Sequence, residues 1–295
     1  MFTVPYDRST AGNKKGLPTP VSSDVNEQVR RGTLEAMFDH LLSDVKMALM
    51  LLDETVDYSR PSTVAANALL ARIYLYMGDF TEARAAANSA LASHSKLTDY
   101  NTEDVRYEDV IYLDFTIGSS VINRRPDAAI DPELYAAYAN NDLRKTKFFA
   151  MNPDGLPYKL NTHGVGLSYL FTGFDTDELY LIRAECAARL GDAQAAFNDI
   201  NHLLEHRYVT GTYVPKTDGS ADEVLAFVLQ ERRKEMLYRG VRWSDLRRLN
   251  VLGANITLTR QLGEQTFILP PGDARWTLPI PLNEIKTSGI EQNIR

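Results

Sequence analysis

The sequence contains a single cysteine and no long apolar run. Cys186 is the only cysteine among 295 residues, so the chain forms no internal disulfide and no cysteine-based zinc site. The longest apolar stretches are short and interrupted by charge, which excludes a helix that crosses a membrane. Basic residues are also scarce, with 32 Lys and Arg against 39 Asp and Glu and a net charge of −7. This balance argues against nucleic-acid binding, which depends on clustered cations.

Sequence patterns of common catalytic and nucleotide-binding sites are missing as well. The chain has no P-loop, GxGxxG, GxSxG or HExxH pattern. Cys186 is flanked by alanines in a helical run, which is typical of a small buried thiol rather than of a nucleophile. His202 and His206 have the spacing of two metal ligands on one helix, but the sequence offers no third ligand. We therefore expect no catalytic residue, no metal and no cofactor.

Helical periodicity is strong on both sides of the middle of the chain. Two helical pairs share one template, in which small or apolar residues stand at offsets 0, 3, 7, 9, 12, 16 and 19. The template begins at Ala71 in the first pair and at Ala184 in the second. This is the spacing of a tetratricopeptide (TPR) repeat, in which small residues let two antiparallel helices cross closely. We predict a mainly all-α fold with TPR-like helical pairs at residues 62–93 and 175–206.

The two helical pairs are not tandem repeats, because the residues between them have a different pattern. Their template positions lie 113 residues apart, whereas tandem TPR copies lie about 34 apart. Twelve of the 28 aromatic residues fall between the pairs, together with Pro and Gly. We expect one domain, residues 1–295, with helical repeat parts at 33–93 and 175–250. Residues 95–174 are predicted to form an irregular, loop-rich and aromatic insertion, and residues 251–295 an extended tail.

Two carboxylates interrupt the apolar stripe of the last long helix. Glu231 and Glu235 fall on the face that carries valine and phenylalanine further upstream. A buried carboxylate is costly unless it is paired, so we expect a structural ion network and a buried Glu231. Acid–base catalysis by the two carboxylates is the less favoured interpretation. The candidate partners are the following arginines: Arg183, Arg233, Arg242 and Arg247.

The aromatic insertion has two interpretations. Its rings either pack the insertion onto the helices or present flat apolar faces to sugar rings. Tyr158, Tyr169 and Phe171 are the candidate ligand contacts, because Gly, Asn and Thr beside them suit exposed loops. A glycoside hydrolase is a third and less favoured class, since it needs a pair of carboxylates. The acidic residues available for such a pair are Asp99, Asp109, Asp114, Asp127 and Asp131.

Several motifs, in matching order along the chain, resemble those of the SusD/RagB family. Residues 178–192 contain ELYLIRAE followed by GD, and residues 231–248 contain ERRKEM followed by GVRWSDLRR. Residues 68–80 are similar to a helix of that family, and residues 141–144 read NDLR. Residues 279–293 carry PIP, EI and QN in the family's order. The resemblance extends over nearly the whole chain.

The resemblance implies a helical repeat scaffold and a non-catalytic lipoprotein of the outer membrane, exposed at the cell surface. Such a protein captures glycans and works with a SusC-type TonB-dependent transporter. Residues 1–8 show no signal peptide and no lipid anchor, so we expect the chain to be the C-terminal part of a family member. Membrane attachment would then depend on an N-terminal lipid that this chain lacks. A TPR-type scaffold that binds a peptide or protein is the alternative function.

Overall fold

The structure is a computed structural model and is mainly helical, as predicted. It describes residues 1–24, 27–28, 30–54, 57–102, 108–117, 129–160 and 169–294, apart from the side chains of Ile117 and Tyr169. Internal contacts divide the chain into two compact units. Unit 1 contains residues 1–47, 76–79 and 243–295, and unit 2 contains residues 48–75 and 80–242.

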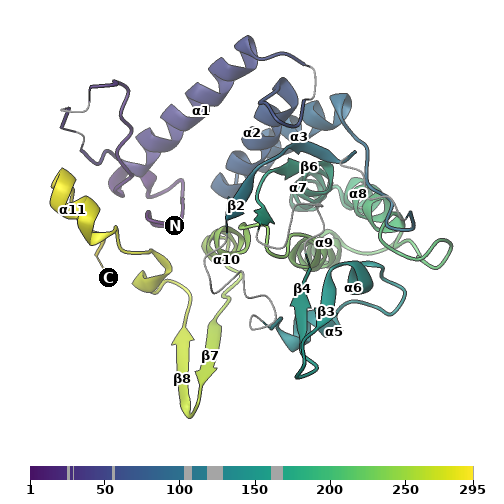
Figure 1. The fold of residues 1–295 in the computed structure, drawn as a ribbon. Helices are drawn as coiled ribbons and strands as arrows, with labels where there is room; N and C mark the ends of the chain where they lie inside the picture. Colours follow the sequence, from purple (N-terminus) through teal and green to yellow (C-terminus); the bar gives the residue numbers. More distant parts are fainter. Residues whose placement is uncertain are drawn as a thin grey trace. The chain divides into compact units, whose positions relative to one another are not determined.

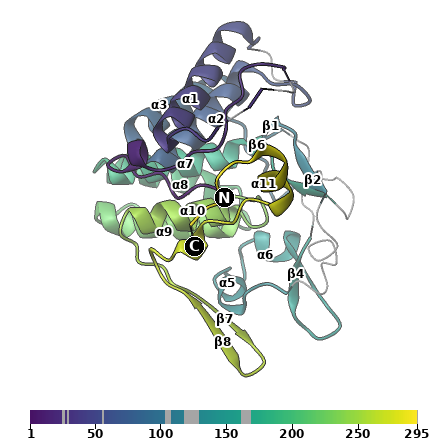
Figure 2. The same cartoon turned by 90° about the vertical axis from the view of Figure 1, so that its left-hand side faces the viewer.

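Helices alternate with short strands along the chain (Figures 1 and 2). The α-helices are α1 (Leu34–Leu51), α2 (Thr63–Met77), α3 (Phe80–Ser93), α5 (Pro132–Ala136), α6 (Arg144–Lys147), α7 (Thr176–Arg189), α8 (Ala193–Glu205), α9 (Ala221–Glu235), α10 (Arg242–Val251) and α11 (Leu282–Ser288). The short 3-10 helices are η1 (Ala11–Asn13) and η3 (Ala274–Trp276). Within the described residues, no helix combines the length and the apolar character that spanning a membrane requires.

The strands form two-stranded antiparallel sheets. They are β1 (Val110–Tyr112) with β6 (Phe174–Asp175), β2 (Phe115–Ile117) with β5 (Tyr169–Phe171), β3 (Phe149–Met151) with β4 (Pro157–Lys159), and β7 (Leu258–Leu262) with β8 (Gln265–Leu269). The first three sheets lie in or next to the predicted insertion, whereas the β7–β8 hairpin belongs to the C-terminal tail.

The two predicted helical pairs are confirmed as α2 with α3 and α7 with α8. Gly78 and Gly191 follow the first helix of each pair with left-handed φ angles of 78° and 84°, a backbone conformation that glycine adopts without strain. The residues at template offsets 0, 3, 12, 16 and 19 are buried in both pairs, and the residue at offset 9 is half-buried in both. The same spacing therefore gives the same pattern of buried side chains.

Helix α7 is the centre of unit 2. It packs against α3, α8 and α9, and Figure 1 shows α7, α8 and α9 side by side. Twelve of its 14 residues are buried, including Cys186, which agrees with the expectation of a buried thiol. A helix that is buried on almost every side needs small residues at its closest contacts, which Ala184 and Ala187 provide.

The described part of the insertion is irregular and has a small core of its own. Tyr138 packs edge-to-face on Phe149, with ring centroids 5.1 Å apart, and Tyr100 packs on Phe148 at 5.9 Å. All four rings belong to one buried cluster. Edge-to-face aromatic pairs stabilise a core beyond the area that they bury. Much of the aromatic enrichment therefore packs the insertion itself, which is the first of its two interpretations.

In unit 1, the last residues of the chain pack against the first. The side chain of Gln292 forms hydrogen bonds with both backbone groups of Ile280, at 2.8 and 2.9 Å. Asn293 Nδ2 donates to the carbonyl oxygens of Phe2 and Leu278, at 2.9 and 2.8 Å. The QN and PIP motifs thus hold these two segments together. The tail is not extended throughout, because it also contains the β7–β8 hairpin and α11.

We predict that Gly173→Ala destabilises unit 2 by about 3 kcal/mol, since overpacking of this kind forces the backbone to shift. A Cβ atom at Gly173 would lie 1.9 Å from the carbonyl oxygen of Tyr112. Gly32→Ala is the matched control, because a Cβ there meets nothing within 4 Å. Urea denaturation measures both variants. Equal midpoints for the two would contradict the prediction.

Candidate functional site

Unit 2 contains a group of buried charged residues around α7 and α9. Among the described residues it includes carboxylates that are each at most 4% exposed, namely Asp142, Asp175, Asp177, Glu178, Glu231 and Glu235. Their cationic partners are Arg72, Arg144, Arg207, Arg232, Lys234 and Arg239. These twelve residues are called the ion network below. Its acidic and basic members are equal in number, so most of the buried charge is compensated.

Arg144 binds three carboxylates at once. Its Nε and Nη2 donate to the two carboxylate oxygens of Asp142, at 2.9 and 2.7 Å. Its Nη1 donates to Glu235 at 2.8 Å, and its Nη2 also donates to Glu231 at 2.6 Å. Burial alone would lower the pKa of Arg144, but the surrounding carboxylates raise it well above its ordinary value. Lys234 of α9 also lies 3.1 Å from Asp142, so the insertion and α9 are joined by several charged contacts.

Glu235 is bound through both of its oxygens. One oxygen accepts from Arg144, and the other accepts from Arg207 Nε at 2.7 Å. Arg207 follows α8 and also donates to the carbonyl oxygen of Thr98 at 2.7 Å. Burial alone would raise the pKa of Glu235, but Arg207 and Arg144 lower it to about 2. Glu235 therefore stays ionised and connects α9 with the insertion and with the end of α8.

Asp175 and Asp177 lie at the start of α7 and share Arg239. The Arg239 guanidinium donates to Asp175 at 2.7 Å, whereas Asp177 lies 3.7 Å from both Arg239 and Arg207. Burial raises the pKa of Asp177 well above its ordinary value, and the neighbouring Asp175 adds to this effect. The ion network thus contains one carboxyl group whose pKa is raised by its surroundings rather than lowered.

Glu178 joins α7 to two other helices. Arg72 of α2 donates to it from Nε at 3.0 Å, and Arg232 of α9 donates to it at 3.3 Å. Burial alone would raise the pKa of Glu178, but the two guanidinium groups lower it. Each helix that packs on this side of α7 is therefore held by a charged contact as well as by apolar packing.

The expected structural ion network differs from the observed contacts in its partners. Glu231 and Glu235 are each 3% exposed, as the sequence led us to expect of Glu231. The proposed arginines, however, have other positions. Arg183 pairs with Asp199, and Arg233 pairs with Asp131. Arg242 is exposed, and Arg247 lies in unit 1, where it donates to the carbonyl oxygen of Thr3. The observed guanidinium partners, Arg144 and Arg207, come from the insertion and from the segment after α8.

The cations that pair with Glu231 and Glu235, none of which was a sequence candidate, are Arg144, Arg207 and Lys234. One signal was present for Arg144, because Asp142 and Arg144 belong to the NDLR motif at residues 141–144. A loop motif that combines an acid and an arginine is a natural candidate for pairing with buried carboxylates elsewhere. Arg207 has no comparable signal, since it stands directly after a helix in a sequence without a motif.

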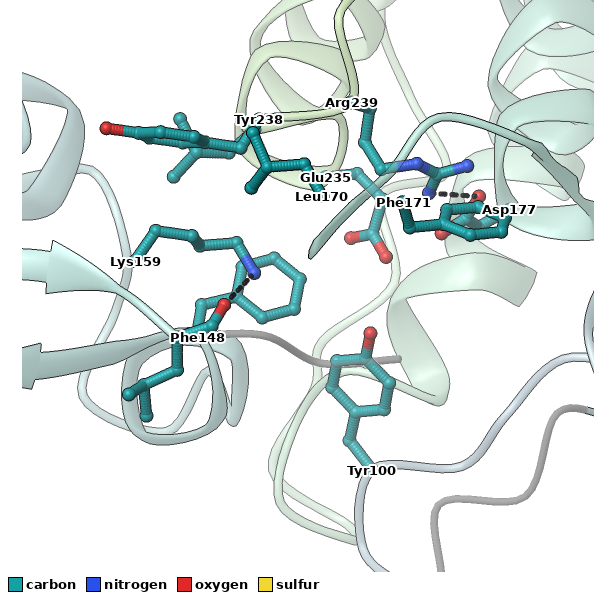
Figure 3. Close-up of a pocket in the computed structure, with 11 residues that line it drawn as sticks. Tyr100, Phe148, Lys159, Leu170, Phe171, Asp177, Glu235, Tyr238 and Arg239 are labelled. Atoms are coloured by element: carbon teal, nitrogen blue, oxygen red, sulfur yellow. Dashed lines mark hydrogen bonds and ion pairs between the residues drawn. The ribbon is translucent and has the colours of Figure 1, made fainter. Parts of the chain in front are cut away.

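A small pocket lies against the ion network. Its walls combine rings and apolar side chains of the insertion with Asp177, Glu235 and Arg239. Figure 3 shows the Tyr100 hydroxyl and the Glu235 carboxylate pointing towards each other across this space. The pocket has a volume of about 30 Å³, which is the space of a water molecule or of one hydroxyl group. It admits a single small polar group rather than a whole ring.

Two polar atoms of the pocket residues lack a hydrogen-bond partner among the described residues. They are the carboxyl oxygen Oδ1 of Asp177 and the donor Nε of Arg239. A hydroxyl group both donates and accepts, so it has the chemistry to pair with either atom. Arg239 lies over the Phe171 ring, 4.3 Å from its centroid, and Lys159 lies over the Phe148 ring at 3.9 Å. These cation–π contacts fix the rings of the pocket wall.

The loop between α9 and α10 forms part of the rim of the pocket. Tyr238 has a φ angle of 64°, which is rare for a residue with a Cβ and is found preferentially at functional sites. Its ring is half-buried, and Figure 3 shows it pointing away from Glu235 and Asp177. The next residue, Arg239, reaches into the ion network. The loop thus presents an aromatic ring at the rim and a cation at the base of the pocket.

The three candidate ligand contacts have different positions. Phe171 is 3% exposed and lines the pocket beside Arg239. Tyr158 is half-buried on β4, opposite Ala150 of β3, and is not part of the pocket wall. The backbone of Tyr169 pairs with Ile117, but its side chain lies outside the described residues. The structure therefore brings only Phe171 to the pocket and adds Tyr100 and Tyr238, which the sequence analysis did not single out.

The pocket does not have the chemistry of a hydrolase. The pKa of Asp177 is raised and that of Glu235 is lowered to about 2, and acid–base enzymes also use two carboxyl groups whose pKa values differ. Both oxygens of Glu235, however, are bound by arginines, and a carboxylate with a pKa of about 2 is a weak base.

The insertion aspartates that were considered for a hydrolase pair have other positions. Asp99 accepts a hydrogen bond from Asn101, Asp114 accepts one from Thr172, and Asp131 accepts one from the backbone of Glu133. Asp109 is buried, and Asp127 lies outside the described residues.

The two helical histidines lie close together, with ring centroids 5.0 Å apart. Burial lowers the pKa of His202, and the nearby His206 adds to this effect. Within the described residues, no group of three or more His, Cys, Asp or Glu side chains is arranged to hold a metal ion.

Comparison with known sequences gives matches at both ends of the chain. The sequence profile described as "SusD family" matches residues 176–294, which include α7 to α10. A second profile, described as "Starch-binding associating with outer membrane", matches residues 2–75. No curated protein sequence matches the chain significantly.

Solved structures match the chain over nearly its whole length. A SusD superfamily protein of Bacteroides thetaiotaomicron is 21% identical, with a TM-score of 0.76, over 99% of this chain and 73% of that protein. A SusD-like carbohydrate binding protein of Bacteroides vulgatus is 18% identical, with a TM-score of 0.72, over 97% and 72% of the two chains. A laminarin binding SusD-like protein is 17% identical, with a TM-score of 0.63, over 99% and 73%. At these identities the likeness establishes the fold.

We predict that Glu231→Ala destabilises the protein by about 3–5 kcal/mol, because Arg144 and Lys234 each lose a buried carboxylate partner. The free energy of unfolding in urea measures this. Asp222→Ala, an exposed position in the first turn of the same helix, is the control and is expected to change stability by less than about 1 kcal/mol. An unchanged midpoint for Glu231→Ala would refute the role given to the ion network.

Glu235 and Asp177 are expected to affect stability with opposite pH dependence. The folded-state pKa of Glu235, about 2, is below its ordinary value of 4.5, so its contribution is present above pH 4.5 and lost as the pH falls towards 2. Glu235→Gln should therefore cost about 3 kcal/mol at neutral pH and less in acid. The folded-state pKa of Asp177 is raised above 3.8, so its contribution is present below pH 3.8 and lost as the pH rises.

Asp177→Asn should accordingly become more stable relative to the parent protein as the pH rises. Urea denaturation of both variants across the acid and neutral range tests this pair of predictions. The two amide variants act as controls for each other, since both remove one carboxylate from the same network. Differences from the parent that do not vary with pH, or that vary in the same direction, would contradict the assignment.

Proposed function

Because the chain belongs to the SusD/RagB family, we propose that it captures polysaccharides or oligosaccharides at the outer-membrane surface. Proteins of this family are non-catalytic glycan binders. The match to a profile for starch binding in association with the outer membrane supports the proposed location. The carbohydrate-binding and laminarin-binding relatives of similar fold support a glycan ligand. The observation that carries the proposal is the hydroxyl-sized pocket, where Asp177 Oδ1 and Arg239 Nε have no hydrogen-bond partner among the described residues.

In the proposed complex, one hydroxyl group of the glycan enters the pocket and binds Asp177 Oδ1 and Arg239 Nε. The sugar ring stays outside, because the pocket of about 30 Å³ is too small for it. Tyr238, at the rim, packs on the apolar face of the ring, as aromatic side chains do in carbohydrate sites. Tyr158, Tyr169 and Phe171 remain proposed contacts of the insertion for the same or neighbouring sugar units.

The proposed partner for import is a SusC-type TonB-dependent transporter. This part of the proposal rests on family membership, and the site described above does not bear on it. Delivery of a glycan to a transporter requires a binder that holds its ligand without changing it, which agrees with the bound state of Glu235. The chain would then act by capture and transfer rather than by chemistry.

The proposal is tested by affinity electrophoresis of the full chain through gels that contain starch, laminarin or other polysaccharides. We expect retardation by at least one glycan and no release of reducing ends. Tyr238→Ala should weaken the binding about five- to tenfold, since one stacked ring contributes about 1 kcal/mol. Tyr58→Ala is the matched control, because Tyr58 is 46% exposed and does not line the pocket.

The remaining candidates are tested in the same gels. Phe171→Leu keeps an apolar wall and is expected to weaken binding less than Tyr238→Ala does. Tyr158→Ala and Tyr169→Ala reveal whether the insertion contributes further contacts. Binding that is unchanged in all four variants would show that the glycan site lies elsewhere, and retention by no glycan would contradict the proposed function.

A further inference from the structure

Unit 1 contains a larger pocket that the proposed glycan site does not use. Its volume is about 320 Å³, roughly ten times that of the pocket in unit 2. It is lined by segments that are distant in sequence, which are residues 4–14, the last turns of α10 and residues 272–277. On α10, Arg247, Asn250 and Val251 have the i, i+3, i+4 spacing of one helix face, which explains why all three line it.

Arg247 is the unusual residue of this pocket. It is 1% exposed, and its Nη2 donates to the carbonyl oxygen of Thr3. Its Nε and Nη1 have no hydrogen-bond partner among the described residues, and no carboxylate there forms an ion pair with it. Burial lowers the pKa of Arg247, and no carboxylate offsets this. The buried guanidinium group of Arg144, by contrast, pairs with three carboxylates.

The other charged residues of the pocket do not compensate Arg247. Asp273 already pairs with Arg275 at 2.7 Å. Asp7 accepts hydrogen bonds from the backbone and hydroxyl of Ser9, at 2.9 and 2.7 Å. Lys14 adds a second cation to the wall. With Asp273 neutralised by Arg275, the two cations outnumber the one other carboxylate, so the pocket has one positive charge in excess.

The size and the remaining walls of the pocket limit the ligand further. A volume of about 320 Å³ is at the lower end of the range of small-molecule sites, about 300–1,000 Å³. Val4, Pro5 and Trp276 provide apolar surface, whereas Thr10 and Asn250 provide polar groups. A ligand that fits has one negative charge, an apolar face and further hydroxyl groups. A single sugar unit with a carboxylate combines these properties.

We propose that the pocket of unit 1 binds a carboxylated monosaccharide unit, of the hexuronic acid type, with its carboxylate on Arg247. Nε and Nη1 of Arg247 supply the donors, and Lys14 provides a second positive charge at the mouth of the pocket. Charge-assisted hydrogen bonds of this kind are the strong ones in proteins, and a buried arginine is suited to a carboxylate. The unit is either a free hexuronic acid or the end of an acidic oligosaccharide.

The test is isothermal titration calorimetry of the full chain with glucuronic acid, glucose and acetate, and with an oligosaccharide that ends in glucuronic acid. We expect glucuronic acid to bind at least tenfold more tightly than glucose or acetate, since loss of a charge-assisted pair or of the ring contacts costs at least about tenfold. A tighter oligosaccharide would identify the chain end as the source. Acetate binding as tight as that of glucuronic acid would overturn the sugar part of the proposal.

Variants separate ligand binding from folding. Arg247→Met should lose glucuronic acid binding but keep a melting temperature close to that of the parent protein, because Arg247 has no ion pair to lose. Arg260→Met, at an exposed arginine of β7 that does not line the pocket, is the matched control and should bind as the parent does. Lys14→Gln, an exposed change that does not endanger folding, should weaken binding several-fold. Unchanged binding in both Arg247→Met and Lys14→Gln, or no binding of glucuronic acid by the parent, would refute the proposal. Neither result depends on the glycan site of unit 2, which the Tyr238→Ala variant reports separately.

Discussion

A single carboxylate, Glu235, accepts hydrogen bonds from Arg144 on one oxygen and from Arg207 on the other. The three residues come from α9, from the insertion and from the segment after α8, so this contact links three segments of unit 2. Burial of so many charges is costly, and close pairing of acids with cations offsets the cost, although Asp177 lies 3.7 Å from its cations. The repeat scaffold and the irregular insertion therefore behave as one body in unit 2, and the position of the pocket depends on it.

The same contact also determines what the pocket can do. A carboxylate held by two arginines does not accept a proton readily. Glu235 therefore serves as a fixed hydrogen-bond acceptor for the two guanidinium groups rather than as a base. Asp177, which lies 3.7 Å from both Arg239 and Arg207, has a raised pKa and an Oδ1 atom without a hydrogen-bond partner among the described residues. A rigid donor and acceptor next to an aromatic rim suit a ligand with many hydroxyl groups. The chemistry of the site thus agrees with capture of a glycan and not with its cleavage.

The sequence predicted best those features that repeat with a period. The helical pairs follow from the spacing of Ala71, Ala184 and their equivalents, because small residues at fixed offsets have a direct geometric meaning. Burial of Glu231 followed from its place on an apolar helix face. The partners and the pocket did not follow, because Arg144, Arg207 and the pocket residues meet only through the tertiary fold. The high aromatic content of the insertion did not show which rings contact a ligand, for a similar reason. Tyr138 and Phe149 pack in a core, whereas Tyr238, outside the insertion, lies at the rim of the pocket.

The left-handed backbone at Tyr238 places folding and binding in competition at one position. A residue with a Cβ costs about 1–2 kcal/mol in this conformation, whereas glycine adopts it freely. Glycine at this position would relieve the backbone but would remove the ring from the rim. In the proposed function, the chain gives up a small part of its stability so that one aromatic side chain stays fixed before any ligand arrives. Stabilising substitutions selected without a glycan present would be expected to accumulate at this position first, at the expense of affinity.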